Sequence, residues 1–307
     1  GVFHRMIQTI DGLLPDTDYE IMLVRANETS ETVTFHTEPE PITLNVRDFG
    51  AFGDGVHDDT SAIQAAILCC PKNARVLIPK GTYPVTALFL KSDMILELQE
   101  NAVLAGIYDR ARTPILPGQI EYDNEDGYYN LGSWEGNPID SFASMITGIH
   151  VKNVTICGKG VLDGRADFEN WWSRPKDKIR AWRPRMIFLN HCENITVVGV
   201  TVQNSPAWNL HPYFSNQIRF LDMEVKGPAN SHNTDGCDPE SCTNVEIAGV
   251  HFSVGDDCIA IKSGKIYMGK KFKVPSKHIH IRQSWMQDGH GAVTVGSEIA
   301  AGVDDIH

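Results

Sequence analysis

The sequence predicts an all-β fold built of stacked coils, and two observations lead to this expectation. A short motif recurs from residue 153 onward: a polar residue, often Asn, followed by an apolar–polar–apolar triplet. Helical periodicity is nearly absent outside one short segment. Because each copy of the motif suits one short strand, its repetition favours a solenoid in which every coil contributes such a strand.

The spacing of this motif indicates coils with insertions. Its apolar markers are Val154, Ile195, Ile218, Val245, Ile279 and Ile306, which are separated by steps of 41, 23, 27, 34 and 27 residues. A minimum near 23 with longer steps between is typical of coils that carry loops on one side. We therefore expect short parallel strands separated by turns that bear Gly or Asn.

One amphipathic helix is predicted ahead of the coils. The stretch DDTSAIQAAILCC places Ile63, Ala66, Ile67 and Cys70 on one face, behind Asp59 and Thr60 as a cap. A helix in this position would cover the open end of a parallel β-helix. Such a cover protects a backbone edge that otherwise promotes aggregation.

The first 40 residues have a different character. Two alternating strands are predicted around 19–24 and 32–36, with a polar turn between them. The pattern L-x-P-x-T-x-Y, followed by a strand ending in Thr, resembles the last strands of a fibronectin type III domain whose first half would lie upstream. We expect residues 1–40 to be the end of such a β-sandwich, EPEP to act as a linker, and residues 41–307 to form a C-terminally incomplete β-helix domain.

Composition narrows the possible partners. A net charge of -12 over 307 residues argues against nucleic acid, and no apolar run is long enough to span a membrane. Seven cysteines in no disulfide or zinc pattern are interpreted as mostly reduced core residues. An extracellular or periplasmic location is favoured over the cytoplasm, and the oligomeric state stays open.

Three carboxylates define the candidate site. Asp235 precedes the adjacent pair Asp256 and Asp257 by 21 positions, about one coil, so the two motifs can face one groove from neighbouring coils. Spacing alone leaves three interpretations open: a calcium site, polar turns, or an acid–base set for glycoside hydrolysis. In the last, repulsion between neighbouring carboxylates would raise one pKa and supply the proton donor.

Longer motifs favour the third interpretation. NTDGCD, GDDCIAIKSG and DGHGAVTVGSE together resemble the NTD, DD and G-H-G motifs of the polygalacturonase family, glycoside hydrolase family 28. The likeness continues upstream through VRDFGAFGDGVHDDTSAIQAAI and GKGVLDG, so that it covers most of residues 43–307. A fibronectin-like module ahead of the hydrolase resembles bacterial exo-acting members more than fungal endo-acting ones.

The resemblance implies a right-handed parallel β-helix that cleaves α-1,4-linked galacturonate with inversion and needs no cofactor or metal. It implies that Asp256 is the general acid, that Asp235 and Asp257 activate water, and that His290 maintains the acid. The family's Arg-Ile-Lys substrate motif would follow beyond the end of this sequence. The implied partner is polygalacturonate or an oligogalacturonide, with no nucleic acid and no membrane.

Residues around these motifs are candidates for substrate binding. Lys262 follows Asp257 by five residues and is the best candidate for a uronate contact. Residues 262–282 carry a formal charge of +7, and such a cationic insertion in an acidic protein suits a polyanionic substrate. Trp172 is interpreted either as a sugar-stacking or as a core-packing side chain. The predicted substrate-binding set is Asn233, Gly289, Gly291, Lys262, Arg183, Arg185 and Trp172.

Three alternatives compete with this assignment. A rhamnogalacturonan hydrolase is the nearest, although such enzymes tend to lose part of the NTD and G-H-G signature. A non-catalytic β-helix that binds polysaccharide would have no reason to keep all of Asp235, Asp256, Asp257 and His290. A calcium-dependent pectate lyase would need metal and a basic residue for β-elimination.

Overall fold

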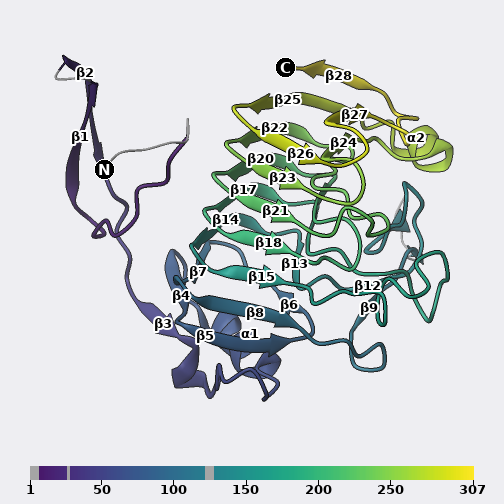
Figure 1. The fold of residues 1–307 in the computed structure, drawn as a ribbon, viewed down its shortest axis with the longest axis horizontal. Coiled ribbons are helices and arrows are strands. Elements are labelled where there is room, and N and C mark those ends of the chain that lie inside the picture. The colour runs from purple at the N-terminus through teal and green to yellow at the C-terminus, as the bar shows by residue number, and fades with distance from the viewer. Residues whose placement is uncertain (1–6, 26–27, 122–127) are drawn as a thin grey trace.

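The computed structural model describes residues 7–25, 28–121 and 128–307. From Thr43 onward the chain winds into a parallel β-helix whose coils stack from β3 at one end to β28 at the other (Figure 1). The strands of successive coils pair in parallel, and they form three long sheets that run along the stack. The predicted all-β solenoid is therefore confirmed.

The first sheet has nine strands and is called the long sheet: β3 Thr43–Asn45, β4 Ala74–Ile78, β7 Met94–Leu98, β14 Lys152–Gly158, β17 Glu193–Val198, β20 Asn216–Leu221, β22 Thr243–Ala248, β25 Ser276–Arg282 and β28 Val303–Ile306. The second sheet has seven: β5 Gly81–Val85, β8 Ala102–Gly106, β15 Val161–Asp163, β18 Thr201–Gln203, β21 Glu224–Lys226, β23 His251–Ser253 and β26 Trp285–Asp288. The third, called the site sheet, comprises β6 Leu88–Phe89, β13 Ile146–Ile149, β16 Ile187–Asn190, β19 Leu210–Tyr213, β24 Ile259–Ile261 and β27 Val293–Val295. Single-residue bridges through Cys237 join β19 to β24.

The recurring sequence motif sets the register of the long sheet. Its markers pair coil to coil, in the order Val154, Ile195, Ile218, Val245, Ile279 and Ile306. The polar residue before each marker has a left-handed backbone, with φ between 54° and 57°. Asn adopts this conformation more readily than most residues, and the side chain of Asn194 also donates to that of Asn153 at 2.9 Å. The preference for Asn therefore has a backbone cause.

Apolar side chains fill the interior of the coils. Ile156, Val197, Phe220 and Ile247 are stacked in register and are fully buried. Burial of one such side chain contributes roughly 1.5–3 kcal/mol relative to leaving it exposed. Because each coil adds its own layer of these side chains, the stack has one continuous core.

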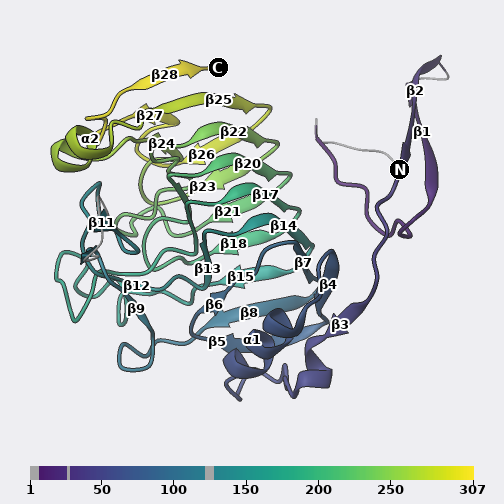
Figure 2. The ribbon, with the colours of Figure 1, turned by 180° about the vertical axis from the view of Figure 1, so that it is seen from behind.

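The predicted helix is present as α1, Thr60–Cys69, and it lies against the first coil (Figure 2). It buries Ile63, Ala66 and Ile67, as the periodicity predicts. The capping differs in detail, since the side chain of Asp59 makes no cap hydrogen bond. Its carboxylate instead accepts from the backbone of the preceding loop, at Phe52 N and Gly53 N, and thereby holds that loop against the helix.

The N-terminal region forms an antiparallel hairpin of β1 Asp18–Arg25 and β2 Glu28–His36. Both predicted strands are present, and the second begins earlier than expected. The hairpin stands apart from the coils beyond residue 43 (Figures 1 and 2). Within the described residues, no helix is long and apolar enough to cross a membrane.

Smaller elements interrupt the coils. They are the 3₁₀ helix η1 Val46–Phe49, the helix α2 Ile266–Phe272, and the antiparallel pairs β9 Ile115–Leu116 with β12 Ser141–Phe142 and β10 Ile120–Glu121 with β11 Tyr128–Tyr129. Helix α2 was not anticipated, because seven residues are too few for a clear periodic signal. All seven cysteines are free thiols and five of them are buried, which agrees with the prediction of reduced core residues.

Candidate active site

The predicted carboxylates lie at one edge of the site sheet, where neighbouring coils begin their strands. Asp235 stands two residues before Cys237, and Asp257 two residues before its bridge partner Ile259, so the two carboxylates occupy equivalent positions on adjacent coils. A hydrogen bond of 2.8 Å from Gly236 N to Asp257 O fixes this register. The expected stacking of the two motifs is confirmed.

The three carboxylates converge on one point. One oxygen from each of Asp235, Asp256 and Asp257 lies within 4.8 Å of the other two. Asp235 is buried, whereas the other two are partly exposed. Calcium takes roughly six to eight oxygen ligands in protein sites. These three carboxylates could supply part of such a set, and their close approach also suits acid–base chemistry.

His290 comes from the next coil and completes the group. Its Nδ1 lies 3.2 Å from Asp256 Oδ1, and its side chain is 72% exposed, so the imidazole faces the open side of the site. Its backbone N–H donates to Asp256 O at 3.0 Å, which fixes the two residues side by side. The contact that the predicted role of His290 requires is present, and its action on Asp256 stays a prediction.

The two glycines beside His290 permit this close packing. At Gly289, where φ is +143°, a Cβ would lie 2.7 Å from Asp256 O. At Gly291, a Cβ would lie 2.8 Å from the Asp257 carboxylate. Only glycine therefore lets the third coil approach the Asp256–Asp257 pair. Contact of these glycines with a sugar stays a prediction.

Burial governs the ionisation of Asp235. It raises the pKa of Asp235 to about 7, and the charges of Asp256 and Asp257 act in the same direction. Lys262 opposes them by favouring the ionised carboxylate. Because the normal pKa of an aspartate is about 3.9, Asp235 retains a proton at mildly acidic pH, where an isolated carboxylate would have lost it.

Arg183 holds the segment that carries Asp235. Its Nη2 donates to Asn233 Oδ1 at 2.6 Å, and its Nη1 donates to the backbone oxygens of Pro206 and His232. Asn233 has a left-handed backbone, with φ of 56°. Arg183 is only 1% exposed, so the predicted substrate contact is wrong for this residue. It supports the N-T-D motif instead, while contact of Asn233 with substrate stays a prediction.

Lys262 is also buried, which contradicts its predicted role as a uronate contact. Its Nζ donates to Glu298 Oε2 at 2.9 Å and to Gly296 O at 3.2 Å, and it lies 3.7 Å from Asp238 Oδ1. A lysine ammonium has three N–H donors. Two protein oxygens accept from this ammonium and a third, charged oxygen lies nearby, and the side chain is only 5% exposed, so it does not present its charge to a sugar carboxylate.

The substrate contacts predicted for Arg185 and Trp172 are also wrong. Arg185 is 2% exposed and lies 5.1 Å from the ring centre of Trp208 and 5.3 Å from that of Trp134. Trp172 is 3% exposed, and its Nε1 donates to Ser205 O. Neither side chain presents a free face to a sugar, so the core-packing interpretation of Trp172 holds.

The sequence patterns did not single out several tryptophans close to this site. The rings of Trp134 and Trp182 stack at 4.8 Å, and Trp134 stacks on Trp208 at 6.3 Å. Trp208 occupies the position equivalent to Asp235 one coil earlier, since its neighbour Asn209 donates to Asp235 O at 2.8 Å. The coil step of 27 residues would have found Trp208, whereas nothing local predicted its partner from a distant loop.

The cationic segment 262–282 is more neutralised than its formal charge suggests. Four of its seven cations pair with acids: Lys262 with Glu298, Lys265 with Glu135, Lys277 with Asp304, and Arg282 with Glu246. Of the others, Lys270 and Lys273 are exposed, whereas Lys271 is partly buried and its ammonium lies over the rings of Tyr267 and Phe272. These three lysines lie in and just after α2, which contacts the loop around Gly136 through the hydrogen bond from Lys265 N to Gly136 O.

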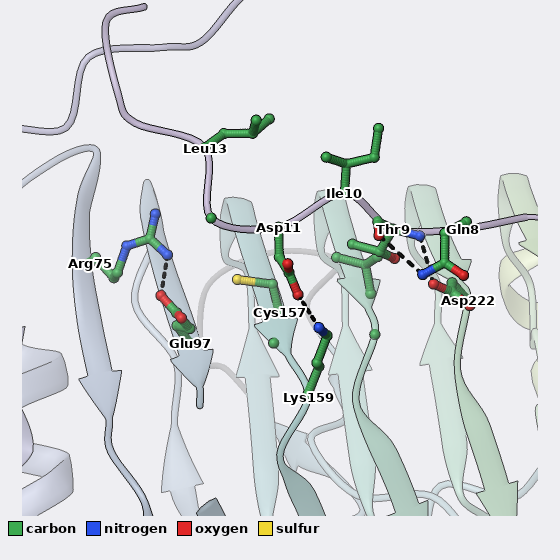
Figure 3. Close-up of a pocket in the computed structure, with 14 residues that line it drawn as sticks. Gln8, Thr9, Ile10, Asp11, Leu13, Arg75, Glu97, Cys157, Lys159 and Asp222 are labelled. Carbon is green, nitrogen blue, oxygen red and sulfur yellow. Dashed lines mark hydrogen bonds and ion pairs between the residues drawn. The ribbon is translucent and has the colours of Figure 1, made fainter. Parts of the chain in front are cut away.

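A cavity of about 430 Å³ lies away from the carboxylates, between the N-terminal segment and the long sheet (Figure 3). Its charged residues are largely paired, as Arg75 is with Glu97 and Lys159 with Asp11. None of the three site carboxylates lines it. We therefore place the candidate chemistry at the site sheet and not in this cavity.

The fold and the site define a parallel β-helix whose adjacent coils present an acid–base carboxylate cluster. The family model described as "Glycosyl hydrolases family 28" matches residues 117–307, and one described as "Rhamnogalacturonase A/epimerase, pectate lyase-like" matches residues 43–160. The chain belongs to glycosyl hydrolases family 28. The fibronectin type III-like module finds no support among these matches.

Individual relatives agree with this family. The chain is 32% identical to a probable polygalacturonase of Vitis vinifera, over 84% of this chain and 52% of that protein. It is 29% identical to an exo-poly-alpha-D-galacturonosidase of Dickeya chrysanthemi, over 99% of this chain and 57% of that protein. This chain spans a little over half the length of these curated relatives.

Solved structures show the same fold. An exopolygalacturonase from Thermotoga maritima has a TM-score of 0.75 and 28% identity, covering 87% of this chain and 65% of that one. The family 28 exopolygalacturonase of Yersinia enterocolitica has a TM-score of 0.76 and 27% identity, covering 94% and 57%. The fold is therefore shared with these structures over most of the chain.

Proposed function

We propose that the protein hydrolyses α-1,4-galacturonosyl linkages of homogalacturonan by an inverting acid–base mechanism, acting from a chain end. The convergence of Asp235, Asp256 and Asp257 within 4.8 Å, with His290 beside Asp256, is the observation that carries this proposal. The relatives from Dickeya, Thermotoga and Yersinia, which are exo-acting galacturonosidases or exopolygalacturonases, support the substrate and the exo mode.

Each residue has a defined task in this mechanism. Asp256 protonates the glycosidic oxygen, and its partial exposure and contact with His290 suit a donor that meets the substrate. Asp235 and Asp257, on adjacent coils, accept the proton of the attacking water. The water adds to the anomeric carbon as the leaving sugar receives the proton from Asp256, so one proton is taken up for each proton given.

The stereochemical outcome is the direct test. Inverting glycosidases usually hold their carboxyl groups about 6.5–9.5 Å apart, and retaining ones about 5–5.5 Å. The oxygens here lie closer than either range, so distance does not assign the mechanism. With full-length protein and oligogalacturonates, NMR should show the β-anomer as the first product. A first product that keeps the α-anomer would make one carboxylate a nucleophile and overturn inversion.

The same reaction separates the alternatives. Reducing sugar should form without an ultraviolet-absorbing unsaturated product, and prior treatment with EDTA should leave the rate unchanged. Unsaturated product with a calcium requirement would identify a lyase. Release of sugar only from rhamnogalacturonan would favour that hydrolase, and binding without any product would indicate a non-catalytic polysaccharide-binding β-helix.

We infer that helix α2 and the loop around Gly136 wall one side of the cleft and favour attack from a chain end. The two contact each other, and Trp134 of the same loop stacks on Trp208 next to the Asp235 position. Figure 2 shows α2 and β11 on one flank of the coils. The exposed side chains of Lys270 and Lys273 lie on this wall, where they could attract a polyanion.

Replacing the exposed Lys270 and Lys273 together with Ser should raise KM at low ionic strength and spare kcat. Exposed lysine–carboxylate contacts contribute roughly 0–1 kcal/mol each and are screened by salt, so the effect should fade as salt increases. Initial rates at two ionic strengths measure it. An unchanged KM at low salt would show that this segment is a solvated surface insertion with no part in substrate binding.

Two further proposals concern the whole protein. Residues 1–40 form the end of a fibronectin type III-like module, which is supported by the antiparallel pairing of β1 with β2. The protein acts in the periplasm or outside the cell, because its proposed polymeric substrate lies there. Limited proteolysis of the full-length chain at the EPEP linker and fractionation of the source cells test these two points.

A further inference from the structure

A short stretch between β11 and β12 packs against the residues that hold the N-T-D motif. This stretch, residues 133–136, is called the Trp134 loop. Trp134 is 4% exposed. Its ring centre lies 4.8 Å from that of Trp182 and 6.3 Å from that of Trp208, and both ring planes lie within 10° of its own. The loop therefore places a buried aromatic stack beside the coil that precedes Asp235.

Arg183 connects this stack to the N-T-D motif. Its Cζ lies 5.3 Å from the ring centre of Trp134, within the distance of a cation–π contact. Its Nη2 donates to Asn233 Oδ1 at 2.6 Å, and its Nη1 donates to His232 O at 2.8 Å. Within the described residues, the Nε of this buried guanidinium has no hydrogen-bond partner. Because a buried cation needs compensating contacts, the ring of Trp134 contributes to holding Arg183 in place.

The other end of the Trp134 loop is fixed by a later part of the chain. Lys265 N donates to Gly136 O at 3.1 Å, and Lys265 Nζ lies 3.6 Å from Glu135 Oε2. A Cβ at Gly136, where φ is +71°, would lie 2.6 Å from Lys265 N and 2.9 Å from Glu298 Cγ. The loop docks without room for a side chain at this glycine. It is thus held at both ends, so the ring that it carries has a fixed position.

We propose that Trp134 is a positioning residue, which holds Arg183 on the N-T-D segment and thereby fixes Asp235 within the carboxylate trio. This inference rests on the proposed hydrolase function. Asp235 follows Asn233 by two residues, so freedom at the contact with Arg183 passes directly to the carboxylate. A displacement of about 1 Å between reacting groups can cost about 10²-fold in rate. Trp134 therefore acts on the chemical step through a neighbour and not by contact with the sugar.

Trp134→Leu in the full-length protein should lower kcat on oligogalacturonate by about tenfold or more and leave KM nearly unchanged. Leucine fills part of the volume but offers no aromatic face, so Arg183 loses a contact and the segment before Asp235 is held less firmly. Trp134→Phe should restore most of the lost kcat, because it keeps a ring beside the guanidinium. An equal loss of kcat in both variants would contradict the role of the aromatic face.

Trp171→Leu is the matched control, because Trp171 is also a buried ring beside an arginine. It is 3% exposed, and the Cζ of Arg110 lies 4.4 Å from its ring centre. Arg110 donates to Ile179 O, which is outside the N-T-D segment. Trp171→Leu should lower Tm, whereas its kcat, measured below that Tm, should stay close to that of wild type. If Trp171→Leu lost as much kcat as Trp134→Leu, loss of any buried ring would explain the effect and the proposal would be wrong.

A double-mutant cycle tests whether Trp134 acts through Arg183. Arg183→Lys keeps the charge, but one ammonium cannot reproduce the planar contacts of the guanidinium with the ring, the Asn233 side chain and the backbone oxygens. If Trp134 acts through Arg183, the variant that combines Trp134→Leu with Arg183→Lys should be no slower than Arg183→Lys alone. Losses of kcat that multiply in the combined variant would show two independent effects and overturn the proposal.

Hydrogen exchange without substrate separates this inference from the proposed function. In Trp134→Leu, the backbone amides of residues 231–238 should exchange faster than in wild type, whereas in Trp171→Leu their exchange should not change. Unchanged exchange in Trp134→Leu would disprove the coupling even in an active enzyme. Faster exchange in Trp134→Leu, together with a wild-type protein that cleaves no galacturonan, would instead disprove the proposed function alone.

Discussion

Replacing Asp256 with Asn should lower kcat on oligogalacturonate by about 10²–10⁴-fold while KM changes little. The amide keeps the shape of the carboxyl but cannot protonate the leaving oxygen, so the loss appears in the chemical step. That range corresponds to about 3–5 kcal/mol of transition-state stabilisation. Steady-state kinetics on the full-length protein, with calorimetric binding of an oligogalacturonate to the inactive variant, measure both parts.

Neighbouring substitutions show whether the trio acts as a unit. Asp235→Asn and Asp257→Asn should cause losses of similar size, because each removes part of the group that activates water. Asp288→Asn is the matched control: this carboxylate is exposed, lies two residues from His290, and accepts a hydrogen bond from Ser253 Oγ at 2.8 Å. The kcat of the Asp288→Asn variant should stay close to that of wild type. If kcat fell as much in Asp288→Asn as in Asp256→Asn, the assignment of Asp256 as the acid would be contradicted.

Gly236→Ala should both destabilise the protein and lower its activity, although it adds a single methyl group. A Cβ at this position would lie 2.3 Å from Cys258 O and 2.4 Å from Phe252 Cδ1, and the backbone oxygen cannot rotate away. The coils must therefore move apart at the hydrogen bond from Gly236 N to Asp257 O. Overpacking of this kind costs about 1–3 kcal/mol.

The catalytic effect of Gly236→Ala should exceed its effect on stability. A misplacement of about 1 Å between reacting groups can cost about 10²-fold in rate, and this contact sets the distance between Asp235 and Asp257. Gly227→Ala is the control, because a Cβ there meets only Ser231 Oγ at 3.8 Å and should be tolerated. Equal kinetics in the two variants, measured below both melting temperatures, would mean that the register does not govern the chemistry.

The packing at Gly236 also explains the composition of the N-T-D-G motif. The N-T-D segment and the residue after it carry the proposed catalytic Asp235, the left-handed backbone of Asn233, and Gly236, which lets the next coil approach. Its spacing to the D-D pair is the length of one coil. A motif of this kind records backbone packing as well as chemistry, which is why it could be recognised in one sequence.

Features that repeat with every coil could be predicted from the sequence, because each coil places equivalent residues at equivalent positions. The marker residues from Val154 to Ile306 pair in the expected order, because each coil needs one apolar side chain at the same interior position. The carboxylates of Asp235 and Asp257 meet because they occupy equivalent positions on adjacent coils. Helix α1 was predictable from its buried face alone.

The sequence by itself thus determined the solenoid, its capping helix and the members of the carboxylate cluster, since these depend on periodicity and on short, fixed spacings. Only the tertiary structure decided the roles of the long cationic and aromatic side chains. Lys262 is a buried ion-pair partner because the fold brings Glu298, 36 residues later in the sequence, against it. Trp172 is a core residue that donates to Ser205, which lies 33 residues later. Whether such a side chain reaches substrate or protein depends on loops from other coils, and no local pattern encodes their path.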